Sequence, residues 1–529
     1  MISSSKRKVY HKLQTKSLLC LLISLIKVSN IVRSFAFVPK SLSFEVPSLT
    51  CGRRKGGTKL SAKDTSPSFS EESLTTRISP TTRFGPFGSG GTVVGFSKYP
   101  GVRRAFEENF AQRLELGSQL VVYMEGEKVV DLYGFAPETI VDGKTKNYDG
   151  DTLQVVASSG KNMEAIAVAM LVDRGLVRYE DPVQKHWPEF GANGKGQITI
   201  ADVMRHAGGV PFVLESSSQT TTIPITTQDI FEVIPMEKKI CNAPKHPPTM
   251  GSSVCYHAFT RGFLVNGILR RVDPSGRSLG RFLKEEVTDP LSKQTNEPVK
   301  FFCGIPTEDQ ADHTFAPLTI GSKLYTLVVQ VLPALLGFNP QLAAYLRWLF
   351  LRKDGFRGVA RAVVFPYPTP TLLDYASTPE GRSIEFSSAG MHANARSMAQ
   401  INALAMAGDG SLGGVNLLGA KSVEASMGGV QTANDSATGL TLGFTRGGYC
   451  RFSESFRSEH VRDNALFHPD DETAYGNFVG WGGAGGSLSL VDRRRNISFA
   501  YCPNGSGLDA LWGIRTRRIL LELQRALAE

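Results

Sequence analysis

The sequence predicts an α/β domain built on an antiparallel sheet, with helices from both ends of the domain packed on the sheet and a mainly helical subdomain beside it. Three observations support this fold class. Two pairs of strand-like runs lie near the two ends of the domain, at 119–124, 128–133, 486–491 and 497–501. A helical apolar spacing flanks these runs, over 102–114 and 508–527. Between the two pairs, the apolar patterns are mainly helical.

The elements can be justified in chain order. A Glu-Gly-Glu sequence at 125–127 separates the first two strands and predicts a hairpin. The central helices are predicted at 162–171, 198–206, 260–271 and 279–287. Gly175 is a suitable C-terminal cap for the first of them. Residues 212–254 are predicted to be mostly loop.

An apolar insertion at about 303–378 interrupts this order. Its segments 324–338 and 342–351 are strongly apolar, but a glutamine and two prolines break any long span. We expect the insertion to cap a hydrophobic pocket. An extra packed pair of helices and association with a membrane through these segments are the alternatives.

The positive charge of the chain is confined to its beginning. Residues 1–63 hold 13 lysines and arginines against one acid, whereas the rest of the chain has 46 basic and 48 acidic residues. The net charge of +10 therefore gives no reason to expect a nucleic-acid partner.

The same 63 residues have the pattern of a targeting sequence. A basic start precedes a short apolar run at 17–26, and Ala36-Phe37 follows, before a stretch rich in Ser, Thr, Lys and Arg. This resembles the two-part presequence of algae with secondary plastids, in which a signal peptide precedes a transit peptide. Residues 1–63 are therefore predicted to be a plastid presequence, with secretion or an endomembrane location as alternatives. Residues 64–97 are predicted to be a disordered linker before the domain of 98–529.

The cysteines and histidines predict neither a disulfide scaffold nor a metal site. Five of the seven cysteines lie outside the presequence, and none forms a CxxC pair. No HExxH or clustered Cys/His pattern is present in the sequence. We therefore expect no metal and no cofactor.

Ser158-Ser159-Gly160-Lys161 lies where a strand-like segment gives way to an apolar helix. A serine and a lysine three residues apart lie on one face of a helix. At the start of that helix the lysine amine can lie beside the exposed hydroxyl, which is how a serine nucleophile is activated without histidine. By itself the pattern also fits an ordinary N-cap.

Two further motifs favour catalysis. Tyr256-His257-Ala258 is predicted to open a helix, and the glycine-rich run 480–487 enters a strand. Ser-x-x-Lys, Tyr and a glycine-rich strand start, in this order, resemble the serine β-lactamase and penicillin-binding-protein superfamily. The segments that resemble its class C-like branch are 181–190, 206–211, 388–396 and 505 onward. The resemblance covers about 98–525 apart from the insertion, and it implies the β-lactamase/transpeptidase-like fold.

The resemblance also implies roles for single residues. Ser158 would attack an acyl carbonyl, and Lys161 would take or relay its proton. Tyr256 would share that proton, as a base in acylation and as an acid toward the leaving group. The backbone N–H groups of Ser158 and Ala484 would form the oxyanion hole. The pocket would be lined by Trp481, Gly482, Gly483, Ala484 and His392.

Two departures from the class C motifs indicate which branch of the superfamily the chain resembles. Class C β-lactamases have Tyr-x-Asn and Lys-Thr-Gly where this chain has Ala258 and Trp481. Because that Asn and Lys help to bind a β-lactam, hydrolysis of antibiotics is not expected. A Trp-Gly-Gly motif resembles the family VIII carboxylesterases. Trp481 could wall an apolar acyl pocket and donate one hydrogen bond.

Other candidate residues have simpler interpretations. Gly276-Arg277-Ser278-Leu279-Gly280 matches a G-x-S-x-G elbow, but no strand precedes it, so Ser278 is predicted to be an N-cap. His206 and His257 are predicted to be structural. His392 is kept as a substrate contact.

The sequence thus predicts a serine hydrolase that cleaves a small-molecule carboxylic ester through an acyl-enzyme on Ser158. One alternative is a peptidase or amidase of the same fold. The other is a scaffold or filament-forming homo-oligomer with a vestigial site. The relatives also include the mitochondrial β-lactamase-like protein of animals, which resembles a protease and forms filaments. The intact Ser158, Lys161 and Tyr256 argue against that loss of activity.

Overall fold

The computed structural model describes residues 74–529 apart from 83–84, 88–89, 143–147, 212–232, 248–253, 322–374, 408–410, 413–414, 439, 456–470 and 507–512. The predicted presequence and the apolar segments at 324–351 lie outside the described residues. The described part of the chain belongs to one compact unit, Ser70–Glu529.

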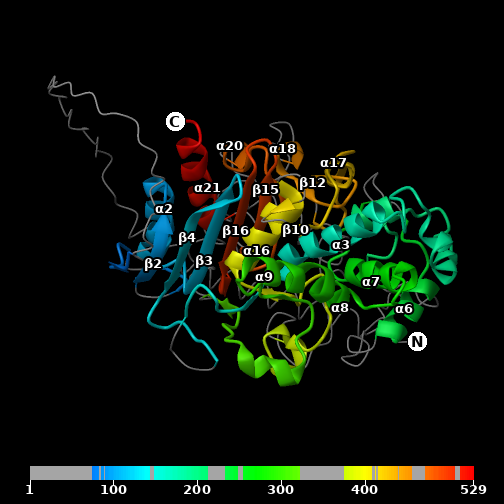
Figure 1. Ribbon diagram of the computed structural model, residues 1–529, viewed down its shortest axis with the longest axis horizontal. Coiled ribbons are helices and arrows are strands. Elements are labelled where there is room, and N and C mark those ends of the chain that lie inside the picture. The colour runs from blue at the N-terminus through cyan, green and yellow to red at the C-terminus, as the bar shows by residue number, and fades with distance from the viewer. Residues whose placement is uncertain are drawn as a thin grey trace, which may run out of the picture. The chain divides into compact units, whose positions relative to one another are not determined.

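An antiparallel sheet of ten strands forms the centre of this unit (Figure 1). In spatial order its strands are β1 (Thr76–Ile78), β2 (Gly91–Ser97), β4 (Glu127–Phe135), β3 (Gly117–Met124), β16 (Ile497–Pro503), β15 (Leu488–Asp492), β14 (Val479–Gly482), β13 (Cys450–Arg451), β12 (Thr441–Phe444) and β11 (Gln431–Asn434). β3 pairs with β16, with Leu120 opposite Tyr501. The two predicted strand pairs therefore meet in one sheet, and the predicted fold class is confirmed.

The helices that surround the sheet are α2 (Pro100–Ala111), α3 (Lys161–Asp173), α4 (Ile200–Met204), α6 (Val233–Asn242), α7 (Thr260–Val272), α8 (Leu279–Leu283), α9 (Asp289–Thr295), α15 (Pro379–Arg382), α16 (Ala395–Asn402), α17 (Ala420–Met427), α18 (Phe452–Ser455), α20 (Asp471–Tyr475) and α21 (Ile514–Ala526). A π-helical turn, Lys284–Thr288, joins α8 to α9.

Helices cover both faces of the sheet because side chains alternate along each strand. On β16, the Ser498 hydroxyl donates to the backbone of Ala399 in α16 at 2.6 Å. Tyr501, an odd number of residues away, projects to the other face, where its ring meets Phe106 of α2 edge-on at 6.5 Å between centroids. α2 packs against α21, so the N- and C-terminal helices of the domain, which were both predicted to pack on the sheet, lie together on one face.

α3 connects the sheet to the helical subdomain. Every residue of α3 from Lys161 to Leu171 is buried, and the helix contacts β14 as well as α7, α8 and α17. Figure 1 shows α3, α6, α7 and α8 gathered on one side of the sheet. Because α3 is packed on all sides, its first turn is held in place, and so are the side chains that project from it.

The prediction of a disordered linker at 64–97 is wrong at 76–78 and 91–97, where the structure has strands. β2 pairs with β4 along its whole length, and β1 pairs with β2 at the edge of the sheet. Gly95 shows why a glycine-rich strand fits here: its φ is +112°, and a Cβ at this position would lie 2.0 Å from the carbonyl oxygen of Asp131. The glycines that suggested a linker thus permit close approach of the two strands.

Other predicted boundaries also differ from the structure. α6 lies inside the segment that was predicted to be mostly loop. The predicted strand 486–491 begins at Leu488, because Gly485 and Gly486 have φ values of +97° and +98° and form a turn. The last helix begins at Ile514 after an extended Gly513 rather than at 508.

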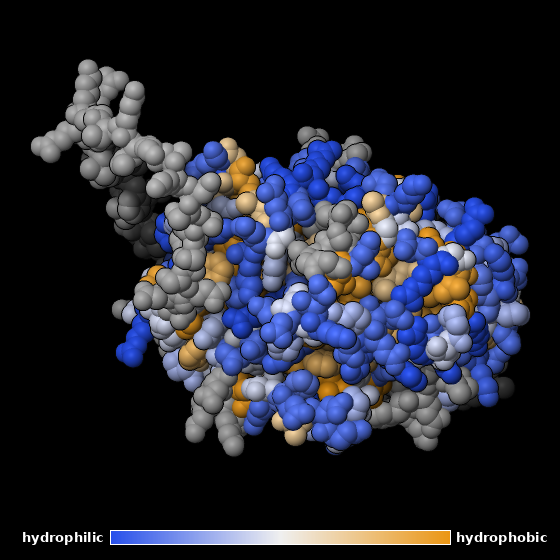
Figure 2. Space-filling view, in the orientation of Figure 1, coloured by the Kyte–Doolittle hydropathy of each residue, from blue (hydrophilic) through white to orange (hydrophobic). Residues whose placement is uncertain are grey.

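The surface of this unit is largely hydrophilic on the face shown in Figure 2. The large apolar side chains that are exposed among the described residues are Leu74, Ile140 and Ile514. They lie far apart in the sequence, and Ile514 is the one that lies in a helix. None of the described helices is long and apolar enough to cross a membrane.

Candidate active site

Ser158 lies in a short 3-10 helix, Ala157–Gly160, between the strand β5 (Gln154–Val155) and α3. Ala157, just before it, has a left-handed φ of +45°. This conformation is unfavourable for a residue with a Cβ, and such strain is common at catalytic turns. Val155 pairs with His392 of β8 (His392–Ala393), which fixes the strand that leads into the turn. Ser158 is half-buried, whereas Lys161 is fully buried.

The three predicted catalytic side chains meet in the structure. Ser158 Oγ lies 2.6 Å from Tyr256 Oη, and Lys161 Nζ donates to the same Oγ at 3.2 Å. Ser158 and Tyr256 are 98 residues apart in the sequence. One hydroxyl therefore contacts both a lysine amine and a tyrosine hydroxyl, which can exchange protons with it.

Lys161 is held by two backbone carbonyls. Its Nζ donates to Ala258 O at 3.0 Å and to Ser388 O at 2.8 Å. Burial lowers the pKa of Lys161 to about 7, while the negative charge of Glu164 raises it and the positive charge of Arg261 lowers it further. The lysine can therefore exist as a neutral amine near neutral pH.

Tyr256 is fixed by its backbone and by ring stacking. Its N–H donates to Asp435 Oδ1 at 2.7 Å, and its ring stacks on Trp481 at 6.0 Å between centroids. Burial raises the pKa of Tyr256, and the hydrogen bond with Ser158 acts in the opposite direction. The hydroxyl is therefore a proton donor at neutral pH. The motif lies in an extended segment just before α7 rather than in its first turn.

Trp481 is buried in an aromatic cluster beside the catalytic side chains. It stacks on Phe444 at 5.6 Å, and its indole N–H donates to Gly448 O at 2.8 Å. The single indole hydrogen bond expected from the sequence thus goes to the backbone. Lys161 Nζ lies 5.8 Å from the centre of the Trp481 ring, so this ring lies beside the catalytic amine.

The glycine-rich run brings the end of β14 against the turn of Ser158. A Cβ on Gly483 would lie 2.4 Å from Val156 O and 3.1 Å from Ser159 N. Ser487 Oγ donates to Val156 O at 2.7 Å, and Ser159 Oγ donates to Ser487 O at 3.0 Å. These contacts require glycine at 483 and attach the turn of Ser158 to the segment that follows β14.

Ala484 lies in an exposed turn after β14, not on the strand as predicted. The turn is closed by a hydrogen bond from Gly486 N–H to Gly483 O at 3.0 Å. Among the described residues, the N–H groups of Ser158 and Ala484 have no hydrogen-bond acceptor. They are therefore available to a developing oxyanion.

The structure places the predicted histidines in the packing around the site. His206 is buried, and its Nδ1 accepts a hydrogen bond from His257 N–H at 3.1 Å. His257 Nδ1 lies 2.6 Å from Cys255 O. Both are structural, as predicted. His392 is 2% exposed and packs edge-on against Phe315 at 5.9 Å. Its expected substrate contact is therefore not supported by the structure, and the residue braces the strand before Ser158.

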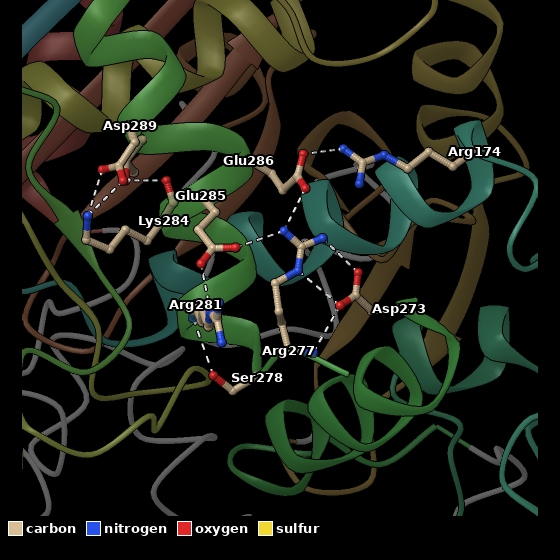
Figure 3. A network of polar contacts seen from close by, with 10 residues as sticks. Arg174, Asp273, Arg277, Ser278, Arg281, Lys284, Glu285, Glu286 and Asp289 are labelled. Atoms are coloured by element: carbon tan, nitrogen blue, oxygen red, sulfur yellow. Dashed lines mark hydrogen bonds and ion pairs between the residues drawn. The ribbon is translucent and has the colours of Figure 1, made fainter. Parts of the chain in front are cut away.

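Ser278 is an N-cap, which excludes the alternative nucleophile among the described residues. Its hydroxyl accepts from Arg281 N–H at 3.4 Å and donates to Glu385 Oε1 at 2.6 Å. Figure 3 shows it beside a partly buried network centred on Arg277, which binds Asp273 and Glu286 at 2.7 Å each. The serine has carboxylates and guanidinium groups around it but no neutral base. A hydroxyl in this setting caps a helix and is not activated.

Sequence reasoning missed a buried ion pair behind Lys161. Glu164 Oε2 lies 3.1 Å from Arg261 Nε, and both side chains are 0% exposed. Glu164 is one turn beyond Lys161 on α3, so the spacing Ser158, Lys161, Glu164 repeats every three residues. A charged residue in an otherwise apolar helix was the available signal, because such a residue is rarely buried without a partner.

No group of three or more His, Cys, Asp or Glu side chains suited to a metal ion occurs in the described part of the chain. The five described cysteines, Cys241, Cys255, Cys303, Cys450 and Cys502, are buried free thiols.

Comparisons with known proteins agree with this geometry. The chain is 34% identical over 197 residues to the esterase/β-lactamase LipL of Mycobacterium tuberculosis (strain ATCC 25618 / H37Rv). This match covers 36% of the chain and only 41% of the length of that relative.

Two solved structures show the same fold at low identity. A penicillin-binding protein homologue from Caulobacter crescentus is 24% identical with a TM-score of 0.62, and the match covers 86% of this chain and 100% of that one. A family VIII carboxylesterase is 23% identical with a TM-score of 0.63, and the match covers 82% of this chain and 99% of that one. The β-lactamase sequence model matches residues 102–524, which include every residue of the site. The chain therefore belongs to the β-lactamase family.

Proposed function

We propose that this protein is a serine hydrolase that cleaves carboxylic esters through a covalent acyl-enzyme on Ser158. The observation that carries the proposal is the contact of one half-buried hydroxyl with Lys161 at 3.2 Å and with Tyr256 at 2.6 Å. A relative at 34% identity is named an esterase/β-lactamase. That name covers two kinds of acyl substrate, esters and β-lactams, and the side chains around Ser158 favour esters.

The side chains support the following sequence of steps. Neutral Lys161 removes the proton of Ser158 Oγ, which attacks the ester carbonyl, while the N–H groups of Ser158 and Ala484 bind the developing oxyanion. The bond between the carbonyl carbon and the alcohol oxygen breaks, and the leaving alkoxide takes a proton from the Lys161–Tyr256 pair. A water molecule then attacks the acyl-enzyme, gives its proton to the same pair, and releases the acid and the Ser158 hydroxyl.

The surroundings favour Lys161 rather than Tyr256 as the base. The pKa of Lys161 is lowered to about 7, whereas burial raises the pKa of Tyr256. A base is effective when its pKa lies near the working pH. Tyr256 is then the acid that serves the leaving group, which is one half of the role expected from the sequence.

The pocket beside Ser158 favours uncharged acyl groups. In class C enzymes an asparagine and a lysine help to bind the β-lactam. Here the corresponding positions have Ala258 and Trp481, whose ring stacks on Tyr256 and on Phe444. Neither side chain carries a charge that could pair with a carboxylate, so these positions suit the apolar acyl chain of an ester better.

A covalent probe tests this proposal directly. The purified protein should react with a fluorophosphonate, and peptide mass spectrometry should place the adduct on Ser158. It should hydrolyse p-nitrophenyl esters, with a chain-length optimum that measures the acyl pocket, and should turn over a chromogenic cephalosporin and a p-nitroanilide poorly. A well-folded protein that forms no adduct would contradict the proposal. Faster hydrolysis of the anilide than of the esters would favour the amidase alternative.

The pH dependence follows from Lys161. Because the neutral amine is the base, kcat/KM for a p-nitrophenyl ester should be low at acidic pH and should rise with unit slope through about pH 7, where the lysine loses its proton. The raised pKa of Tyr256 should keep the alkaline side flat up to the usual range of tyrosine. A rate that instead falls between pH 6 and 8 would mean that protonated Lys161 is the active form.

A further inference from the structure

A buried ion pair lies next to the groups that hold the side chain of Lys161. Glu164 and Arg261 pair at 3.1 Å with both side chains 0% exposed. Burying two charges has a large desolvation penalty, and a well-packed apolar pair is often as stable. Stability alone therefore does not explain why Glu164 and Arg261 are charged, and their contacts indicate a second role.

Glu164 reaches Lys161 through Ser388. The Ser388 hydroxyl donates to Glu164 Oε1 at 2.8 Å and accepts from Gly262 N–H at 2.9 Å. The carbonyl of the same residue accepts from Lys161 Nζ at 2.8 Å. Ser388 thus connects the carboxylate to an anchor of the catalytic amine.

Arg261 holds the other side of the lysine. It donates to the backbone carbonyl of Lys161 at 3.3 Å and to Gly448 O at 3.2 Å. Gly448 O also accepts the indole N–H of Trp481. The Arg261 guanidinium lies 5.3 Å from the centre of the Trp481 ring. One cation therefore binds the first turn of α3 and the aromatic wall of the site.

We propose that the Glu164–Arg261 ion pair is a positioning unit for Lys161, which fixes the backbone anchors of the lysine so that its amine is directed at Ser158 Oγ. This inference rests on the proposed function, in which Lys161 is the base. Neither Glu164 nor Arg261 touches the reacting atoms, so both act through the lysine and the backbone that holds it.

The pair also sets the electrostatic surroundings of the amine. The charged or titratable groups near it are Glu164 from α3, Arg261 from α7, Tyr256 and His257 from the segment before α7, and His206 from the segment after α4. The pKa values of both histidines are lowered by burial, so these rings are neutral near pH 7. Glu164 favours the protonated lysine and Arg261 disfavours it. The two members of the pair therefore act on the lysine in opposite directions.

The opposite signs give a test that a merely structural role would not pass. In full-length protein with 13C-labelled lysine, the Lys161 signal is assigned by its loss in Lys161→Met, and its titration midpoint is measured by NMR. Glu164→Gln should lower the midpoint by about one pH unit and Arg261→Met should raise it by about one unit. The pH midpoint of kcat/KM should move with it. The Glu164→Gln/Arg261→Met double variant should lie between the two and covers the case in which a single variant fails to fold.

Two neighbouring serines provide a matched pair for the positioning role. Ser387 Oγ and Ser388 Oγ both donate to Glu164 Oε1 at 2.8 Å, but only the Ser388 carbonyl binds Lys161. Ser388→Ala should lower kcat about tenfold with little change in KM, because a displaced base slows the chemical step. Ser387→Ala should have a clearly smaller effect on kcat. Glu286→Gln is the control for Glu164→Gln. It makes the same carboxylate-to-amide change in the network of Figure 3 around Arg277, away from the site.

The outcomes separate this inference from the proposed function. Midpoints that stay at the wild-type value, or that move in the same direction in both single variants, overturn the positioning unit. Equal losses in Ser387→Ala and Ser388→Ala overturn the link through Ser388. The NMR midpoint needs no turnover, so opposite shifts in a protein that hydrolyses no ester would support the ion pair while the proposed function fails.

Discussion

Ser158→Ala protein is expected to fold like the wild type and to hydrolyse p-nitrophenyl esters about 10⁵- to 10⁶-fold more slowly, with no fluorophosphonate adduct. The size is that of removing the nucleophile from a serine hydrolase, where only the oxyanion hole and binding remain. The fold should persist because Ser158 is half-buried in the short 3-10 helix before α3, and its hydroxyl forms hydrogen bonds, among the described residues, with the two catalytic partners. Circular dichroism and the urea midpoint check this.

Lys161→Ala is expected to lose nearly as much activity, and the Ser158→Ala/Lys161→Ala double variant to be no worse than either single variant. Groups that act as one unit are non-additive in this way. Lys161→Arg should not restore activity, because a guanidinium stays charged at every accessible pH and cannot act as a base. If the two losses multiply in the double variant, the side chains act independently. That outcome would contradict a joint role for the two groups, which lie 3.2 Å apart.

The local part of the site could be predicted from the sequence. Ser158 and Lys161 are three residues apart at a strand-to-helix junction, and helical geometry alone brings their side chains together. Tyr256 could be added only through the resemblance, because nothing in residue spacing shows that a segment 98 residues away returns to the same hydroxyl. The order of the three motifs supplied that long-range information.

Ser158 and Ser278 show where local reasoning ends. Both serines lie where the sequence predicts the start of a helix, and both match short nucleophile patterns. The structure separates them by their neighbours: Ser158 has a buried lysine at 3.2 Å, while Ser278 has the carboxylate of Glu385 at 2.6 Å. The difference is tertiary, and the sequence distinguishes the two serines through the strand that precedes Ser158 and the motifs that follow it in order.

Parts of the fold and site were missed for a related reason. Glu164 and Arg261 each look like an ordinary charged residue on a helix, and only packing α3 against α7 makes them a buried pair. β2 lies in a segment whose Ser, Thr, Gly and Pro content and weak apolar pattern predict a linker, whereas its pairing with β4 requires its glycines. In both cases the deciding contact comes from a distant segment.

Arg515→Met is expected to lower the free energy of unfolding by about 3–5 kcal/mol, the range found when one partner of a buried ion pair is removed. Arg515 pairs with Glu115 at 3.2 Å, and their side chains are 2% and 0% exposed. It also donates to Gly505 O at 2.9 Å and to Gly485 O at 3.0 Å. One guanidinium therefore joins α21 to the segment before β3 and to the turn that carries Ala484.

Equilibrium urea unfolding at pH 7 measures this effect, with the slope checked for change. Glu115→Gln/Arg515→Met should recover part of the loss, because the double variant no longer buries a carboxylate without this cation. Arg525→Met is the matched control: it lies on the same helix and pairs with Glu522, but its side chain is 69% exposed, and exposed pairs contribute little. Equal midpoints for Arg515→Met and Arg525→Met would show that the buried pair does not stabilise the domain. Because Arg515 binds the turn of Ala484, Arg515→Met should also lower kcat in conditions where it is fully folded, whereas Arg525→Met should not.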